Sequence, residues 1–135
     1  MLFVSIPIAV AEEAGTRTVI QLSPQHRDLV LAEMRQFLSG LQQMTDALSR
    51  DDMETVTRVA RTLGASMSHQ MPADLKAELP EGFRKLGHAV HSRFDQIALD
   101  AEAMEDSQHA LSQLGDTLSR CVSCHSSYQI QAINH

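Results

Sequence analysis

Apolar residues recur every three or four positions along most of this chain, which is the spacing of an amphipathic helix. The first such segment follows Ser23, a favourable N-cap residue, and has Pro24 at its first helical position. Its apolar face consists of Leu31, Met34, Leu38, Leu41, Thr45 and Leu48, widened by Val30, Phe37 and Met44. The pattern therefore predicts a long helix over residues 24–48.

The same spacing predicts three further helices. The second follows the polar residues 49–52 and ends where Gln70–Asp74, which contains Pro72, breaks the pattern; up to Pro80 we expect a loop with one helical turn. The third begins at Pro80, and the fourth follows the capping residues 105–107. Their apolar faces are, in order, Met53, Val56, Ala60, Leu63 and Met67; Phe83, Leu86, Val90, Phe94, Ile97, Ala101 and Met104; and Leu111, Leu114, Leu118, Cys121, His125 and Tyr128.

Four amphipathic helices with mostly short connections are typical of one architecture. They predict an all-α fold, an antiparallel up-down-up-down four-helix bundle. A chain of 135 residues is long enough for one domain with a real core and too short for two. We assign the helical domain to residues 24–130, an N-terminal extension to 12–23 and a C-terminal tail to 131–135.

Charge and hydropathy argue against nucleic-acid binding and against a membrane-spanning helix. The net charge of −6 supplies no basic stripe for phosphates, so we expect no nucleic-acid partner. No stretch approaches the roughly 20 apolar residues of a membrane-spanning helix. The chain has no Trp and only 4% aromatic residues, so a large flat apolar cofactor would suit its core.

The first eleven residues resemble the apolar part of a secretory signal. Ala9-Val10-Ala11 has the A-x-A form of a cleavage site, so we expect export and a mature chain that starts near Glu12. No Lys or Arg precedes the apolar run, so either the true start lies upstream or the signal is atypical. A buried N-terminal strand is the alternative interpretation of this run.

The motif that carries chemistry is Cys121-Val122-Ser123-Cys124-His125, a C-x-x-C-H sequence of the kind that attaches c-type haem. Residues three apart share a helix face, so both thiols can reach the two vinyl groups on one haem edge. The adjacent imidazole can then reach the iron from the same side. Since His125 lies on the apolar face with Leu111 and Leu118, we expect its ring to point into the helical core.

Three other interpretations of the two cysteines remain open. A thioredoxin-like redox pair normally begins a helix after a strand, whereas this pair lies near the end of a helix. A structural zinc site needs four ligands, and no second Cys or His pair occurs at a suitable spacing. A buried C-x-x-C-H without a cofactor is the third possibility.

With Cys121, Cys124 and His125 near the end of a four-helix chain, and Tyr128 as an aromatic three residues later, the sequence resembles the cytochrome c′ family, including its low-spin relatives. The resemblance covers about residues 22–130. It implies a periplasmic protein with one covalent haem c that transfers electrons to redox partner proteins or binds a small gas such as NO or CO, and that can form homodimers. The family usually has Arg or Lys directly after the aromatic, whereas this chain has Gln129.

The resemblance makes the sixth iron ligand the group that separates these functions, since a Met gives a low-spin iron and an apolar side chain leaves an open position. Met34, on the apolar face of the first helix, is the ligand that we expect, and Leu31 is the apolar alternative. Met67, His88 and His91 are further candidates for the haem pocket, as is Tyr128, while Arg27 and Arg35 could pair with propionates.

The sequence therefore predicts a periplasmic one-electron carrier with a haem ligated by His125 and Met34. A five-coordinate gas-binding protein of the same fold is the alternative. A haem-free helical interaction module with a redox C-x-x-C is the alternative from another class. No pair of carboxylates suggests acid–base catalysis, and we expect no enzyme activity.

Overall fold

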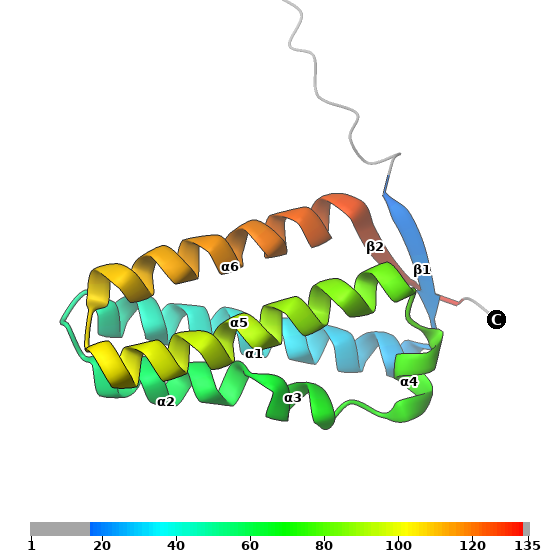
Figure 1. Cartoon of the computed structure of the whole chain (residues 1–135). Coiled ribbons are helices and arrows are strands. Elements are labelled where there is room, and N and C mark those ends of the chain that lie inside the picture. The colour runs from blue at the N-terminus through cyan, green and yellow to red at the C-terminus, as the bar shows by residue number, and fades with distance from the viewer. Residues whose placement is uncertain (1–16, 134–135) are drawn as a thin grey trace, which may run out of the picture.

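Helices account for most of the residues that the computed structural model describes, which are residues 17–133 (Figure 1). They are α1 Pro24–Leu48, α2 Met53–Leu63, α3 Ala65–His69, α4 Ala73–Glu78, α5 Glu81–Met104 and α6 Ser107–Ser127. The prediction of a mainly helical protein is confirmed. The secretion signal assigned to residues 1–11 lies outside the described residues.

Side-chain caps fix where the long helices begin. Ser23 Oγ accepts a hydrogen bond from the His26 amide at 3.1 Å at the start of α1. Asp52 Oδ1 does the same for Thr55 at the start of α2, and Asp106 Oδ1 for His109 at the start of α6, each at 3.0 Å. These bonds satisfy amide donors that have no partner within the helix. The predicted starts of α1 and α6 are therefore confirmed.

The second predicted helix is interrupted at Gly64, which separates α2 from α3. Two side chains of α5 hold this break: Asp95 Oδ2 accepts from the Ala65 amide at 3.0 Å, and His91 Nδ1 lies 2.7 Å from the Leu63 carbonyl oxygen. A Cβ atom on Gly64 would clash with the Asp95 carboxylate. The prediction of one continuous helix through Met67 was wrong, because these contacts come from a distant part of the chain.

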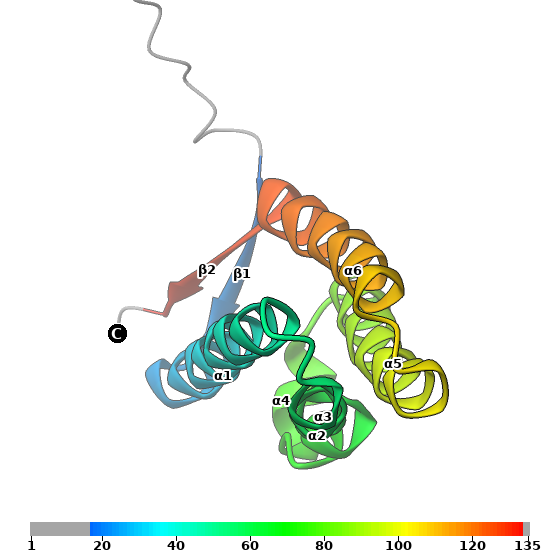
Figure 2. The ribbon, with the colours of Figure 1, turned by 90° about the vertical axis from the view of Figure 1, so that its left-hand side faces the viewer.

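A two-stranded parallel sheet joins the two ends of the described chain. β1 (Thr18–Leu22) pairs with β2 (Tyr128–Ala132), with Thr18 opposite Tyr128 and Leu22 opposite Ala132. The strands cross one end of the helical layer, next to the start of α1 and the end of α6 (Figures 1 and 2). The placement of Tyr128 on the last helix was wrong, because α6 ends at Ser127 and Tyr128 begins β2.

The buried side chains form two separate clusters. The larger cluster lies between α1, α2, α5 and α6, with Phe94, Ile97 and Leu114 among its members. The smaller cluster lies beneath the sheet and joins Ile20, Leu22 and Val30 to Leu75 and Leu79 of the α4 segment. Between them, the facing parts of α1, α5 and α6 carry only partly buried side chains at the level of Met34, Leu86 and Cys121.

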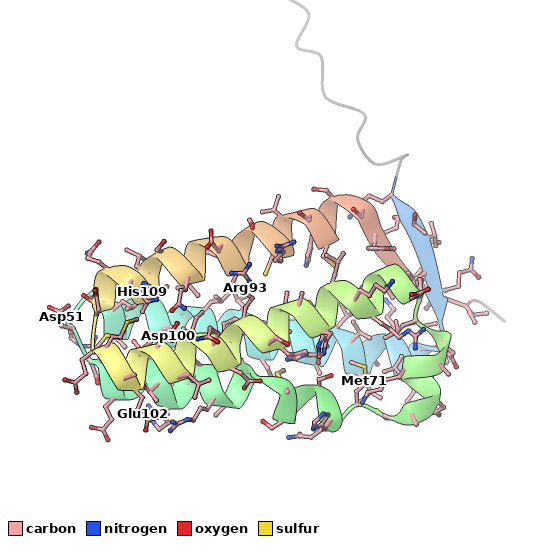
Figure 3. The ribbon with its side chains drawn as sticks, viewed as in Figure 1. Asp51, Met71, Arg93, Asp100, Glu102 and His109 are labelled. Atoms are coloured by element: carbon pink, nitrogen blue, oxygen red, sulfur yellow. The ribbon has the colours of Figure 1, made fainter. Side chains whose placement is uncertain are left out.

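The buried face of α6 differs from the predicted one. Ala110, Leu114 and Thr117 are buried, whereas Leu111 and Leu118 are 47% and 41% exposed and His125 is exposed. The flank that contacts α5 is polar: Gln113 and His109 bond to Asp100, and Arg93 lies 4.0 Å from Asp116 (Figure 3). This flank turns Leu111, Leu118 and His125 away from α5, so the predicted core position of these three residues was wrong.

The larger cluster gives a prediction for stability. Phe94 is 1% exposed, and its ring stacks on Phe37 with centroids 5.6 Å apart. Phe94→Ala is expected to lower the free energy of unfolding by about 3–5 kcal/mol, because it removes buried apolar surface and leaves a cavity. Leu99→Ala on the same helix is the control; Leu99 is 58% exposed, so a change within about 0.5 kcal/mol is expected. Urea denaturation followed by circular dichroism measures both, and equal losses would contradict the prediction.

Candidate functional site

A cleft of about 340 Å³ opens between α1 and the C-terminal end of α6, beside the sheet. It brings together five residues that the sequence analysis named from distant positions: Leu31, Met34, Cys124, His125 and Tyr128. The remaining lining residues are Arg17, Val30, Phe83, Gln129 and Ile130. The walls are therefore largely apolar. They include the end of the C-x-x-C-H motif on α6 and Met34 on α1.

The cleft lies where the core is interrupted. Met34 is on α1 between Val30, which belongs to the smaller cluster, and Phe37, which packs against the larger one. On α6, Cys121 and Cys124 follow Leu114 of the larger cluster and precede Tyr128, which packs against the smaller one. The cleft opens in this interval. A large flat apolar group attached to α6 would fill it, so the residues present fit a haem.

The two cysteines are free thiols, each half-buried near the end of α6. The Cys121 thiol lies 3.7 Å from the Thr117 carbonyl oxygen, one turn earlier. Burial raises the pKa of both thiols, and the nearby Cys121 raises that of Cys124 further. A redox C-x-x-C has a lowered pKa and lies at a helix N-terminus. These surroundings therefore differ from those of a reactive redox dithiol.

His125 forms part of the cleft wall but is exposed. It lines the cleft together with Leu31 and Met34 of α1. The prediction that this ring points into a closed helical core was wrong, because the interval between α1 and α6 is open on this side. What the structure shows is His125 and Met34 on the walls of one cleft.

Tyr128 closes the sheet end of the cleft. Its ring packs edge-on against Phe83, with centroids 5.5 Å apart and planes at 85°. The hydroxyl reaches α5 at Gly82, where a Cβ atom would lie 2.5 Å from the Tyr128 oxygen. A side chain at position 82 would displace the Tyr128 hydroxyl, so glycine permits this contact between α5 and β2.

Three of the predicted pocket residues lie elsewhere. Met67 lines a separate pocket of about 180 Å³ with Leu29 and Met71, near the α3–α4 connection, where Figure 3 labels Met71. His88 and His91 line another pocket, of about 120 Å³, together with Glu33. Phe83 contributes to this last pocket and to the cleft. The structure therefore does not bring Met67, His88 or His91 to the wall formed by Cys124 and His125.

His91 is engaged in a buried polar network of its own. Nδ1 lies 2.7 Å from the Leu63 carbonyl oxygen and Nε2 lies 3.4 Å from Glu33 Oε1, so both ring nitrogens face acceptors. Burial by itself lowers the pKa of His91, but the bonds to Glu33 and to the Leu63 backbone outweigh it, and the pKa is raised. When it is protonated, the ring can donate from both nitrogens and so joins α5 to α1 and to the end of α2.

This network predicts a pH dependence of stability. Because the pKa of His91 is higher in the folded chain than its ordinary value, the folded state binds the proton more tightly, and this contribution is lost as the pH rises through the raised pKa. Glu33→Gln is expected to lower the free energy of unfolding by about 1–3 kcal/mol at pH 6 and to reduce its decline between about pH 6 and 8. Chemical denaturation across this range measures it, and an unchanged slope would contradict it.

Two polar residues in the cleft wall were not predicted from the sequence. Arg17 and Gln129 come from the opposite ends of the described chain, and the Gln129 side-chain amide donates to the Arg17 carbonyl oxygen at 3.4 Å. Arg27 and Arg35, named as propionate partners, do not line the cleft; Arg27 lies 3.8 Å from Asp28, and Arg35 is exposed. Nothing in the local pattern near Arg17 signals its position, because the β1–β2 pairing is long-range.

Among residues 17–133, no three His, Cys, Asp or Glu side chains gather in a way that could hold a metal ion by themselves. No helix in this part of the chain is long and apolar enough to cross a membrane. Comparison with protein-family models, curated proteins and solved structures found no match to the chain. The functional assignment therefore depends on the C-x-x-C-H motif and the geometry around it.

Proposed function

We propose that this protein is an exported, periplasmic c-type haem protein that acts as a one-electron carrier. The observation that supports this most directly is the cleft between α1 and α6, whose walls include Met34, Cys124 and His125. Met34 and His125 are 91 positions apart in the sequence, yet they line the same apolar space. A haem-attachment motif beside an apolar cleft with a methionine in its wall suits a covalently attached haem.

Each residue has a distinct role in this proposal. The Cys121 and Cys124 thiols would each add across a vinyl group of the porphyrin, giving two thioether bonds to α6. The His125 imidazole would hold the iron on one side, and the Met34 thioether would be the sixth ligand. The haem itself supplies the one-electron chemistry. Leu31, Val30 and Phe83 would exclude water from it.

The fold that we infer for this function is the antiparallel up-down-up-down four-helix bundle, formed by α1, α2 with its continuation α3, α5 and α6. Contacts between successive long helices and their alternating directions in Figure 1 support it. In this arrangement the start of α1 and the end of α6 lie at the same end, next to the sheet. Because these two ends are close, Met34 and His125 line the same cleft.

A gas-binding protein is the second candidate. Leu31 lines the same cleft one turn before Met34, so an apolar side chain is also available above the iron. If Leu31 occupies that position, the iron is five-coordinate and open to NO or CO. The absorption spectrum of the ferrous protein separates the two: a low-spin spectrum supports the electron carrier, and a high-spin spectrum that shifts on addition of CO supports the gas-binding protein.

Haem attachment is the first point to test. We expect the exported chain, produced with a c-type haem maturation system, to show a Soret band that remains with the polypeptide after denaturation, and a mass increased by one haem. Export without any added haem under these conditions would overturn both haem-based functions. It would leave the helical interaction module with a C-x-x-C pair as the better account.

A further inference from the structure

The cleft between α1 and α6 contains one permanently charged side chain among the described residues that line it. This is Arg17, which is half-buried and directly precedes β1. The other lining residues are apolar or neutral, apart from the titratable His125, Cys124 and Tyr128. Within residues 17–133 no carboxylate lies within ion-pair distance of the Arg17 guanidinium. An otherwise apolar cleft therefore offers a cation without a protein partner from this part of the chain.

The sheet fixes where the backbone of Arg17 lies. The neighbouring Thr18 pairs with Tyr128, and the Gln129 amide donates to the Arg17 carbonyl oxygen at 3.4 Å. Arg17 is thereby held against the backbone that follows His125 by three and four residues. A guanidinium binds a carboxylate through two parallel hydrogen bonds and keeps its charge at every relevant pH. The haem of the proposed function carries two carboxylates. Any carboxylate that is buried in the cleft needs a partner from the cleft wall.

Given the haem attachment proposed above, we infer that Arg17 is the counter-charge for a haem carboxylate and holds the reduction potential of the haem at a higher value. The reason is electrostatic. The ferrous haem carries one positive charge fewer than the ferric haem, so a fixed cation in a cleft of low polarity stabilises the ferrous form. Arg17 is a positioning and tuning residue in this account, since it does not ligate the iron.

The test is the midpoint potential of the haem-loaded protein with Arg17→Gln. At an applied potential equal to the wild-type midpoint, the ferrous-to-ferric ratio is expected to fall several-fold, up to about tenfold, which corresponds to about 59 mV for one electron. Arg17→Lys keeps the charge and is expected to retain a potential close to that of the wild type. Arg27→Gln is the matched control: it removes the same charge from a residue outside the cleft lining and should leave the potential unchanged.

The pH dependence of the potential identifies the carboxylate. Pairing with Arg17 favours the ionised carboxylate, so its loss moves the pH-dependent break in the potential to higher pH. A potential that falls without any movement of this break would overturn the pairing. So would an unchanged potential in Arg17→Gln, or an equal fall in Arg27→Gln.

Loss of haem attachment in a variant also tests the role of Arg17. If Arg17→Gln accumulates no haem-loaded protein while Arg17→Lys does so with a wild-type potential, the charge requirement is supported. If neither variant takes up haem although both are folded by circular dichroism, the residue acts through its shape, and the inference fails. Failure of the proposed function is a separate result, because then the wild-type chain itself carries no covalent haem.

Discussion

Exchange of both Cys121 and Cys124 for serine is expected to abolish covalent haem attachment completely. Serine is close in size to cysteine, but its hydroxyl does not form the thioether to a vinyl group. Both sulfurs lie half-buried on the inward side of α6, so serine is accommodated without a change in packing. The measurement is the haem absorbance that remains with the polypeptide after denaturation, together with the mass of the intact chain. Single exchanges should retain one thioether and a reduced yield of haem-loaded protein.

Ser123→Ala is the control for this experiment. Ser123 lies between the two cysteines, is exposed, and donates its hydroxyl only to the Ser119 carbonyl oxygen of the same helix. Its exchange alters the motif region without removing a thiol, so attachment should proceed as in the wild type. A double serine variant that keeps denaturant-resistant haem would show that the cofactor is bonded elsewhere.

Replacement of Met34 by alanine is expected to convert a low-spin haem into a high-spin haem that binds CO. In the proposed function the Met34 thioether is the sixth iron ligand, and Met34 lines the α1 side of the cleft that also includes His125. Its loss leaves an open position on the iron, and the midpoint potential should fall because a Met ligand raises it. Ferrous spectra with and without CO, and a redox titration, measure the two effects.

Met71→Ala is the matched control for Met34→Ala. Met71 is also half-buried, but it lines two other pockets and not the cleft. Its loss removes the same side-chain volume without affecting the iron, so the low-spin spectrum should persist. An unchanged spectrum in Met34→Ala would rule this residue out as the ligand, and a high-spin wild-type spectrum would favour the gas-binding alternative with Leu31 above the iron.

Helix starts could be predicted from the sequence because their signals are local. Ser23 with Pro24, and Asp106, satisfy amides within the next three residues, so the pattern that encodes them lies in one turn. The break at Gly64 could not be predicted, although the apolar spacing through Met67 was correct, since Met67 is buried. The break depends on His91 and Asp95, which lie about thirty positions further along the chain.

The buried face of α6 could not be predicted from the sequence either. Positions 110, 114 and 117 and positions 111, 114 and 118 both follow the helical spacing, and the leucines made the second set more hydrophobic. Contacts of Gln113 and Asp116 with α5 decide between them, and they depend on tertiary packing. Cys124 and His125 could be named as candidate site residues because the chemistry of the motif prescribes their spacing, and both line the cleft. Arg17 could not, because its position depends on a strand pairing between the two ends of the chain.

That pairing also affects the order in which the molecule is assembled. During synthesis β1 is made before all the helices and β2 after them, so Thr18 meets Tyr128 only when 110 further residues have been added. Closing so long a loop is entropically costly, and contacts of this range form late in folding. The helices can therefore associate while the sheet end remains open, and in the proposed function a haem would then be attached to the two cysteines before the last strand is in place.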